Sequence, residues 1–175
     1  MKPEAFRNIK KTHRVLIALL ILLIIGAIFH LIGLLKMETQ LYEAYFQVIR
    51  KLSKGDNSLG HSSTRYIAID MTGVFENERE PLEKRLRSWA ESLNCELLIG
   101  TYEELTEAGY VEAGFGARGF KSGVLFRFSN GEINNHTFTV EASKFRGSTS
   151  GNGGFYSVRC TFGIWTVKPI RGWIA

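Results

Sequence analysis

The segment Gly114-Phe-Gly-Ala-Arg-Gly-Phe120 has the spacing Gly-x-Gly-x-x-Gly, which in nucleotide-binding proteins cradles phosphate groups. Such a fingerprint needs a strand before it and a helix N-terminus after it, because the helix end holds the pyrophosphate. The residues that follow, Lys121-Ser-Gly-Val-Leu-Phe-Arg-Phe128, alternate like a strand instead. We therefore predict a turn whose glycines adopt left-handed backbone conformations, and we expect no nucleotide cofactor.

Other side chains that could do chemistry are few. Asp70, in Asp70-Met-Thr72 after an apolar run, resembles the aspartate that opens phosphatase-like domains, although one acid at a strand end is also a common structural cap. His30, His61 and His136 do not have metal-ligand spacing. We therefore expect no metal site and no enzymatic activity. An extracytoplasmic hydrolase that uses Asp70 remains an alternative.

The two cysteines, Cys95 and Cys160, both lie outside the most apolar segment of the chain. In an oxidising compartment two thiols tend to pair where their geometry allows it. We expect a Cys95–Cys160 disulfide, with two buried free thiols as the alternative.

The location of the rest of the chain depends on the apolar run from Val15 to Leu35, which has 21 residues and no formal charge. At 1.5 Å per residue it is long enough to cross a hydrocarbon core of roughly 30 Å. A cleaved signal peptide has a shorter apolar region and a small-residue cleavage site, which is missing here. Five basic residues precede the run and place the N-terminus in the cytoplasm: Lys2, Arg7, Lys10, Lys11 and Arg14.

The formal net charge of +5 belongs to this N-terminal part of the chain. Residues 1–36 hold six basic and one acidic residue, whereas residues 37–175 hold sixteen of each. A neutral extracytoplasmic domain does not have the electrostatic footprint of a nucleic-acid-binding protein. We therefore expect no nucleic-acid partner.

After the apolar run, residues 36–52 keep a helical period. Leu41, Tyr45, Val48 and Leu52 repeat at steps of four, three and four, which is the spacing of a short coiled-coil seam. The pattern predicts a helical stalk that either supports a weak homodimer or packs on its own domain. Residues 53–64 are rich in turn-forming residues and predict a linker.

Residues 65–175 predict one α+β domain. Apolar runs at 65–71 and 96–100 flank an amphipathic helix, which is typical of a βαβ unit with parallel strands. Alternating segments then predict an antiparallel β-meander with a hairpin turn at Asn130-Gly131. We expect a flexible loop at 145–155, and a last strand that begins at Tyr156 and ends before Pro169.

The glycine-rich second half of this domain carries aromatic and basic residues in its predicted loops. Such loops are plausible contact points for a protein partner or an anionic ligand. Alternatively, the phenylalanines hold the loops against the core. The candidate partner-binding residues are Phe115, Arg118, Phe120, Lys121 and Arg146.

Together these patterns predict a non-enzymatic bacterial inner-membrane protein that binds a partner or ligand through a periplasmic domain. Its plan is similar to that of periplasmic accessory proteins of membrane-embedded transcription regulators, and also to that of single-span phage holins. A holin-type lysis protein is therefore the first alternative, and the extracytoplasmic hydrolase is the second. The predicted segments are a basic tail (1–14), a membrane span (15–35), a helical stalk (36–52), a linker (53–64) and the α+β domain (65–175).

Overall fold

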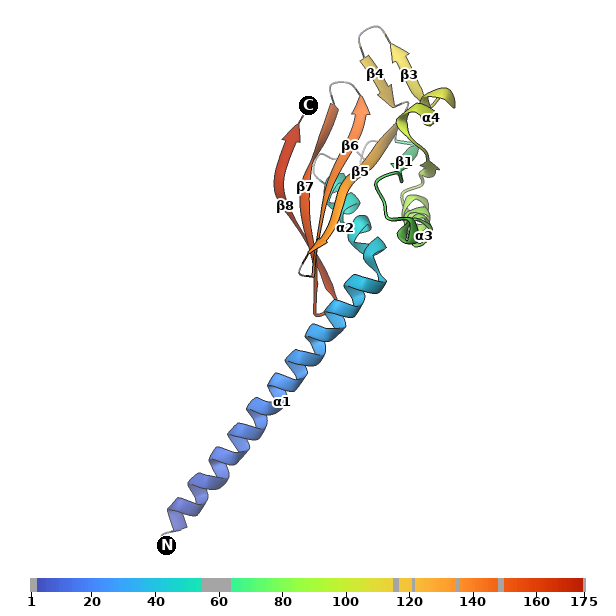
Figure 1. Cartoon of the computed structure of the whole chain (residues 1–175). Coiled ribbons are helices and arrows are strands. Elements are labelled where there is room, and N and C mark those ends of the chain that lie inside the picture. The colour runs from blue at the N-terminus through green and yellow to red at the C-terminus, as the bar shows by residue number, and fades with distance from the viewer. Residues whose placement is uncertain are drawn as a thin grey trace.

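The computed structural model describes residues 3–54, 64–114, 117–120, 122–134, 136–147 and 150–174. The predicted linker 53–64 lies mostly outside the described residues. What is described is a mixed α+β structure with an N-terminal apolar helix and a curled β-sheet (Figure 1). The predicted α+β class is therefore confirmed.

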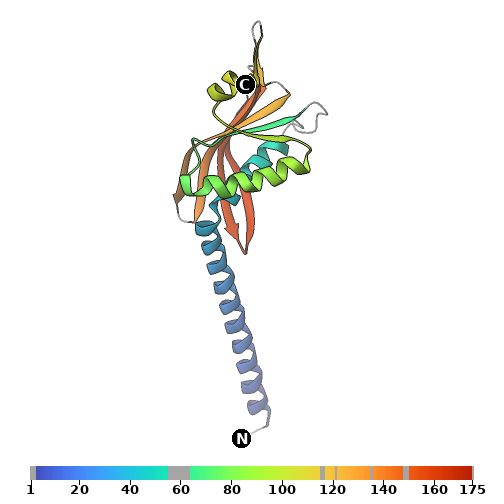
Figure 2. The ribbon, with the colours of Figure 1, turned by 90° about the vertical axis from the view of Figure 1, so that its right-hand side faces the viewer.

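Helix α1 (Pro3–Thr39) projects from the sheet as a long rod (Figures 1 and 2). Its segment Val15–Met37 is long and apolar enough to cross a membrane; most of it is exposed, whereas Gly33 and Met37 near its end are buried against the domain. Gln40 separates α1 from the shorter helix α2 (Leu41–Lys54).

Helix α2 packs on its own domain. The four predicted seam residues, Leu41, Tyr45, Val48 and Leu52, are all buried in the main hydrophobic core. This apolar stripe is therefore covered within the chain and is not available as a dimer seam. The helix belongs to the folded domain, which thus begins before the predicted boundary at residue 65.

Both ends of α2 are held by polar contacts from other elements. The backbone N–H of Tyr42 donates to the carboxylate of Glu78 at 2.7 Å, which satisfies an otherwise unpaired amide at the helix N-terminus. The buried ammonium group of Lys144 donates to the carbonyl of Leu52 at 3.0 Å. Cations near a helix C-terminus are stabilised by its dipole, so each charge suits its end of the helix.

The sheet has eight strands in the described part of the chain. β1 pairs in parallel with β2 on one side and β5 on the other, and β5, β6, β7 and β8 follow in antiparallel order. A β3–β4 hairpin joins the far end of β6. The strands are β1 (Tyr66–Asp70), β2 (Glu96–Ile99), β3 (Val111–Gly114), β4 (Ala117–Phe120), β5 (Gly123–Asn134), β6 (Thr137–Gly147), β7 (Ser150–Thr161) and β8 (Ile164–Ile174).

The two faces of the sheet are covered differently. Helices α2 and α3 (Glu76–Ser92) pack on one face, where Leu82 and Leu86 of α3 belong to the same main core as Phe126 and Val140 of the sheet. The other face carries a smaller cluster under helix α4 (Tyr102–Glu107) and the β3–β4 hairpin. Beyond this cluster, β6, β7 and β8 present an open face.

Three turn predictions were wrong. Asn130-Gly131 is not a hairpin turn but a bulge inside β5, with Asn130 at a φ of 51°. The predicted loop 145–155 is mostly strand, because β6 runs to Gly147 and β7 begins at Ser150. The predicted last strand is broken by a turn at Phe162 and Gly163, both of which have positive φ.

Pro169 lies inside β8 rather than at its end. Proline cannot donate a ladder hydrogen bond, so in sheets it is confined to edge strands and bulges. β8 is an edge strand, and its register with β7 shifts next to Pro169.

Candidate functional site

Of the five predicted contact residues, the structure describes the side chains of two, Phe120 and Arg146. Phe115 and Lys121 lie outside the described residues, and only the backbone of Arg118 is described, in β4. Phe120 is buried against the small cluster under α4, so its predicted role as an exposed contact is corrected. Arg146 is half-buried near the end of β6.

The expected disulfide is absent from the structure, in which Cys95 and Cys160 are both free thiols. Cys95 directly precedes β2, whereas Cys160 is in β7, and three strands separate β2 from β7. At about 4.8 Å per strand the separation is roughly 19 Å, far beyond the Cα distance that a disulfide bridges. Burial raises the pKa of both thiols, which disfavours the reactive thiolate form.

Asp70 ends β1 and is buried beneath the open face. Its Oδ1 atom accepts hydrogen bonds from the Thr72 backbone N–H at 3.0 Å and the Thr72 hydroxyl at 2.6 Å. Its Oδ2 atom accepts from Nε of Arg127 at 3.1 Å. Both carboxylate oxygens are therefore engaged in structural contacts, as expected of a strand-end cap.

A groove on the open face contains Arg127. It lies between α4, the first half of β5, the C-terminal end of β6 and the C-terminal end of β8, and it has a volume of about 570 Å³. Ligand pockets commonly range from roughly 300 to 1,000 Å³, so a small molecule or a short peptide segment would fit. The residues that define its chemistry are Tyr102, Leu125, Arg127, Ser143, Phe145 and Trp173.

The aromatic walls of the groove are fixed by packing. Tyr102 of α4 and Phe145 of β6 meet edge to face, with ring centroids 5.5 Å apart. α4 is itself fixed by a capping box, in which the hydroxyl of Thr101 accepts from the Glu104 backbone and the Glu104 carboxylate accepts from the Thr101 backbone.

The opposite wall depends on glycine. The ring of Trp173 lies over Gly153 of β7, where an added Cβ would come within 2.7 Å of the indole and 2.8 Å of the Ala142 carbonyl oxygen. A side chain at Gly153 would therefore displace Trp173 from the groove.

The polar side chains that line the groove include the guanidinium group of Arg127, the hydroxyl of Ser143 and the carboxylate of Glu103 on α4. The Arg127 side chain is 47% exposed, whereas the Asp70 side chain that pairs with it is only 5% exposed. A ligand next to Arg127 would thus contact the guanidinium group of Arg127 and not the carboxylate of Asp70. In the described part of the chain, no group of three or more metal-binding side chains is found.

No family model, curated protein or solved structure matches this chain. The groove was missed at the sequence level because its residues come from five separate elements, α4, β5, β6, β7 and β8. One signal was present: Arg127 interrupts an apolar strand, where an exposed charge indicates an open face.

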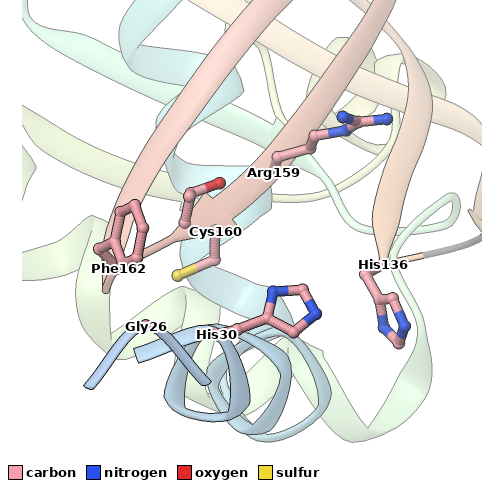
Figure 3. Close-up of a pocket in the computed structure, with 7 residues that line it drawn as sticks. Gly26, His30, His136, Arg159, Cys160 and Phe162 are labelled. Atoms are coloured by element: carbon pink, nitrogen blue, oxygen red, sulfur yellow. The ribbon is translucent and has the colours of Figure 1, made fainter. Parts of the chain in front are cut away.

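A second cavity, of about 420 Å³, lies where α1 meets the lower ends of β6 and β7 (Figure 3). His30 comes from α1, His136 from the turn before β6, and Arg159 and Cys160 from β7. The two imidazole rings stand edge to face, with centroids 6.4 Å apart.

Proposed function

We propose that this chain is a single-pass protein of the bacterial inner membrane whose periplasmic domain binds a protein partner or ligand without catalysis. The apolar length of α1 supports a membrane crossing, and the basic residues before it support a cytoplasmic N-terminus. The described domain then stands on the opposite side of the membrane, joined to the span through Gln40.

The observation that carries this proposal is the groove between Tyr102 and Trp173. It combines three aromatic walls with one accessible guanidinium group, the composition found at the centres of protein interfaces. The Arg127 guanidinium group is a donor between aromatic side chains, so the best ligand at this point is a segment that carries a carboxylate or a row of backbone carbonyls next to apolar side chains, with its acidic end away from Glu103. We therefore favour a partner that inserts an extended segment of this kind.

Binding is favoured over catalysis by the state of the reactive side chains. Asp70 is held by Thr72 and Arg127 and has little exposure to solvent. The pKa of the Cys95 and Cys160 thiols is raised by burial, so neither is poised as a nucleophile. These features support a role for the domain as a recognition module.

Site-specific photo-crosslinking in the native membrane tests the proposal. A photoreactive residue in place of Trp173 should capture one defined partner. A matched control is Ile170, which is on the same strand, is similarly exposed, and lies outside the groove. Arg127→Gln should abolish capture at Trp173 while leaving the amount of protein in the membrane unchanged.

Equal capture at Trp173 and Ile170, or capture that survives Arg127→Gln, would contradict a role for the groove. The same strain reports on the lysis alternative. Rapid loss of membrane potential after induction of the wild-type chain would favour a holin-type function instead.

A further inference from the structure

The lower edge of the sheet lies alongside the apolar helix. Gly33 of α1 faces the backbone of β7, where an added Cβ would come within 2.8 Å of the Cys160 carbonyl oxygen. One helical turn deeper, Phe29 meets Phe162 edge to face, with ring centroids 5.8 Å apart. In both views the β7–β8 turn reaches down along the upper part of α1 (Figures 1 and 2).

This contact sets the depth of the turn relative to a membrane. A hydrocarbon core of roughly 30 Å takes about 20 helical residues, so a span that begins at Val15 leaves the core near residue 34. Phe29 is then about 7 Å inside the core. Amphipathic elements that lie in a membrane interface bury their apolar side chains about 5–10 Å deep. Phe162, which touches Phe29, would lie within this range.

The side chains at this edge suit lipid contact. Phe162 is 58% exposed and Ile164 is 68% exposed, on either side of the turn at Gly163. Ile133, near the neighbouring turn between β5 and β6, is 50% exposed. Large apolar side chains gathered at one end of a domain mark an interaction surface, and here that end is the one next to the span.

Polar groups lie beside these apolar side chains, and two cations, Arg159 and Lys36, come from positions above them on β7 and α1. The cavity between α1 and β7 is lined by His30, His136 and Arg159 (Figure 3). Nε of Arg159 donates to the hydroxyl of Thr137 at 2.7 Å, which fixes the guanidinium group at the cavity. Lys36 lies next to the β7–β8 turn, where an added Cβ at Gly163 would be 3.3 Å from its ammonium nitrogen.

These cations have no internal counter-ion among the described residues. Neither Arg159 nor Lys36 forms an ion pair with a described carboxylate. A guanidinium group binds phosphate oxygens through paired hydrogen bonds, and an ammonium group adds a point charge. Apolar side chains below and unpaired cations above reproduce the order of acyl chain and phosphate in a phospholipid leaflet.

We propose that the lower edge of this domain docks into the outer leaflet of the membrane and that the cavity between α1 and β7 binds the phosphate of an anionic phospholipid headgroup. The inference rests on the proposed membrane crossing of α1. It is independent of the groove, which lies at the opposite end of the sheet. Alkaline extraction of the membrane-bound chain tests the crossing separately.

Depth measurement by spin labelling tests the docking. The full chain, with Cys95 and Cys160 replaced by serine, is placed in nanodiscs with one label at Phe162→Cys or Ile164→Cys. Each label should be more accessible to oxygen than to an aqueous nickel complex. A control label at Glu103→Cys, on exposed α4, should show the opposite order. Aqueous accessibility at both turn positions would overturn the docking.

Lipid selectivity tests the headgroup site. The full chain should retain phosphatidylglycerol over phosphatidylcholine when purified from nanodiscs of mixed composition and analysed by native mass spectrometry. Arg159→Gln should reduce this preference about tenfold, since a charge-assisted hydrogen bond is lost. Lys168→Gln, the same charge change on β8 outside the cavity, should leave the preference unchanged.

Two outcomes would refute the headgroup site. One is an equal loss of selectivity in both variants, which would show a general charge effect. The other is displacement of the lipid by millimolar inorganic phosphate, which would make a soluble anion the ligand. If Arg159→Gln alters the far-ultraviolet circular dichroism, Lys36→Gln replaces it and should show the same selective loss.

Discussion

Tyr45 is the deepest polar side chain of α2, the helix that connects the membrane segment to the domain. It is fully buried and meets Phe128 and Phe138 edge to face, with ring centroids 4.9 and 4.8 Å away. Its hydroxyl has no hydrogen-bond partner within bonding geometry among the described residues, although the backbone of Phe75 lies near it. Burial of the hydroxyl raises the pKa of Tyr45 from 10.0 to about 12. The Phe75 backbone lowers this pKa in part, and the Glu78 carboxylate adds to the increase.

This shift makes stability depend on pH in a defined window. Below pH 10 the Tyr45 hydroxyl is protonated in both the folded and the unfolded chain, so the stability of the folded chain is not reduced by its titration. Above pH 10 the unfolded chain releases the proton, while the folded chain keeps it until about pH 12. One pKa unit corresponds to about 1.4 kcal/mol, so the titration of Tyr45 should lower the free energy of unfolding of the wild type by about 1.4 kcal/mol at pH 11 and by about 2.3 kcal/mol at pH 12.

Tyr45→Phe removes both the titration and an unpartnered buried hydroxyl. At pH 8 we expect the variant to be more stable by roughly 1 kcal/mol, because a buried unsatisfied polar group is unfavourable. At pH 11 the difference should widen to about 2.4 kcal/mol. Urea unfolding of the full chain in micelles, followed by circular dichroism at pH 7, 8, 10 and 11, measures these differences. The values at pH 7 and 8 should agree. A difference that stays constant up to pH 11 would refute the reasoning.

Two further substitutions test how the helices are attached. Glu78→Ala removes the acceptor at the N-terminus of α2 and should lower the free energy of unfolding in urea by about 1–3 kcal/mol. The control Glu76→Ala, on the exposed first turn of α3, should change the free energy of unfolding by less than about 0.5 kcal/mol. Equal effects of the two variants would argue against the contact between Glu78 and α2. Gly33→Leu should separate α1 from β7, seen as a longer distance between spin labels on the two elements, whereas Gly26→Leu has open space around it and should leave the distance unchanged. Unchanged distances in both variants would show that close packing at Gly33 is not needed.

The sequence predicted the parts of the fold that depend on local pattern. The uncharged run from Val15 predicted the apolar helix, and the alternation in residues 137–142 predicted the buried face of β6, where Phe138, Val140 and Ala142 lie in the core. Thr101 and Glu104 have the spacing of a capping box in the sequence, and the structure contains this capping box at the start of α4. In these segments the periodicity of side chains is set by burial of one face, so neighbouring residues carry the signal.

The element that packs against the apolar face of α2 could not be predicted from local pattern. The stripe at Leu41, Tyr45, Val48 and Leu52 has one spacing whether it faces a second helix or a sheet. The structure places it on the sheet, where the Glu78 and Lys144 side chains hold the helix ends. Those two contacts join residues 36 and 92 positions apart, so no local window contains them.

The turns were mispredicted because each depends on the partner strand. Asn130-Gly131 has the residue types of a tight hairpin, but β6 continues to pair with β5 on both sides of it, so the extra residues form a bulge. Gly151, Gly153 and Gly154 resemble a flexible loop in sequence. In β7 they give space to neighbouring strands and to the ring of Trp173 instead.

The two candidate sites lie at opposite ends of one strand, and this separation constrains the partner. Thr137, which holds Arg159 at the lower cavity, begins β6, and Phe145 of the groove lies near its other end. Eight residues of strand at about 3.3 Å each separate the two by roughly 26 Å. If lipid contact holds the lower edge against the membrane, the groove stands about that far from the surface. A partner confined to the bilayer would not reach it, so the segment that binds must come from a protein that extends well into the periplasm.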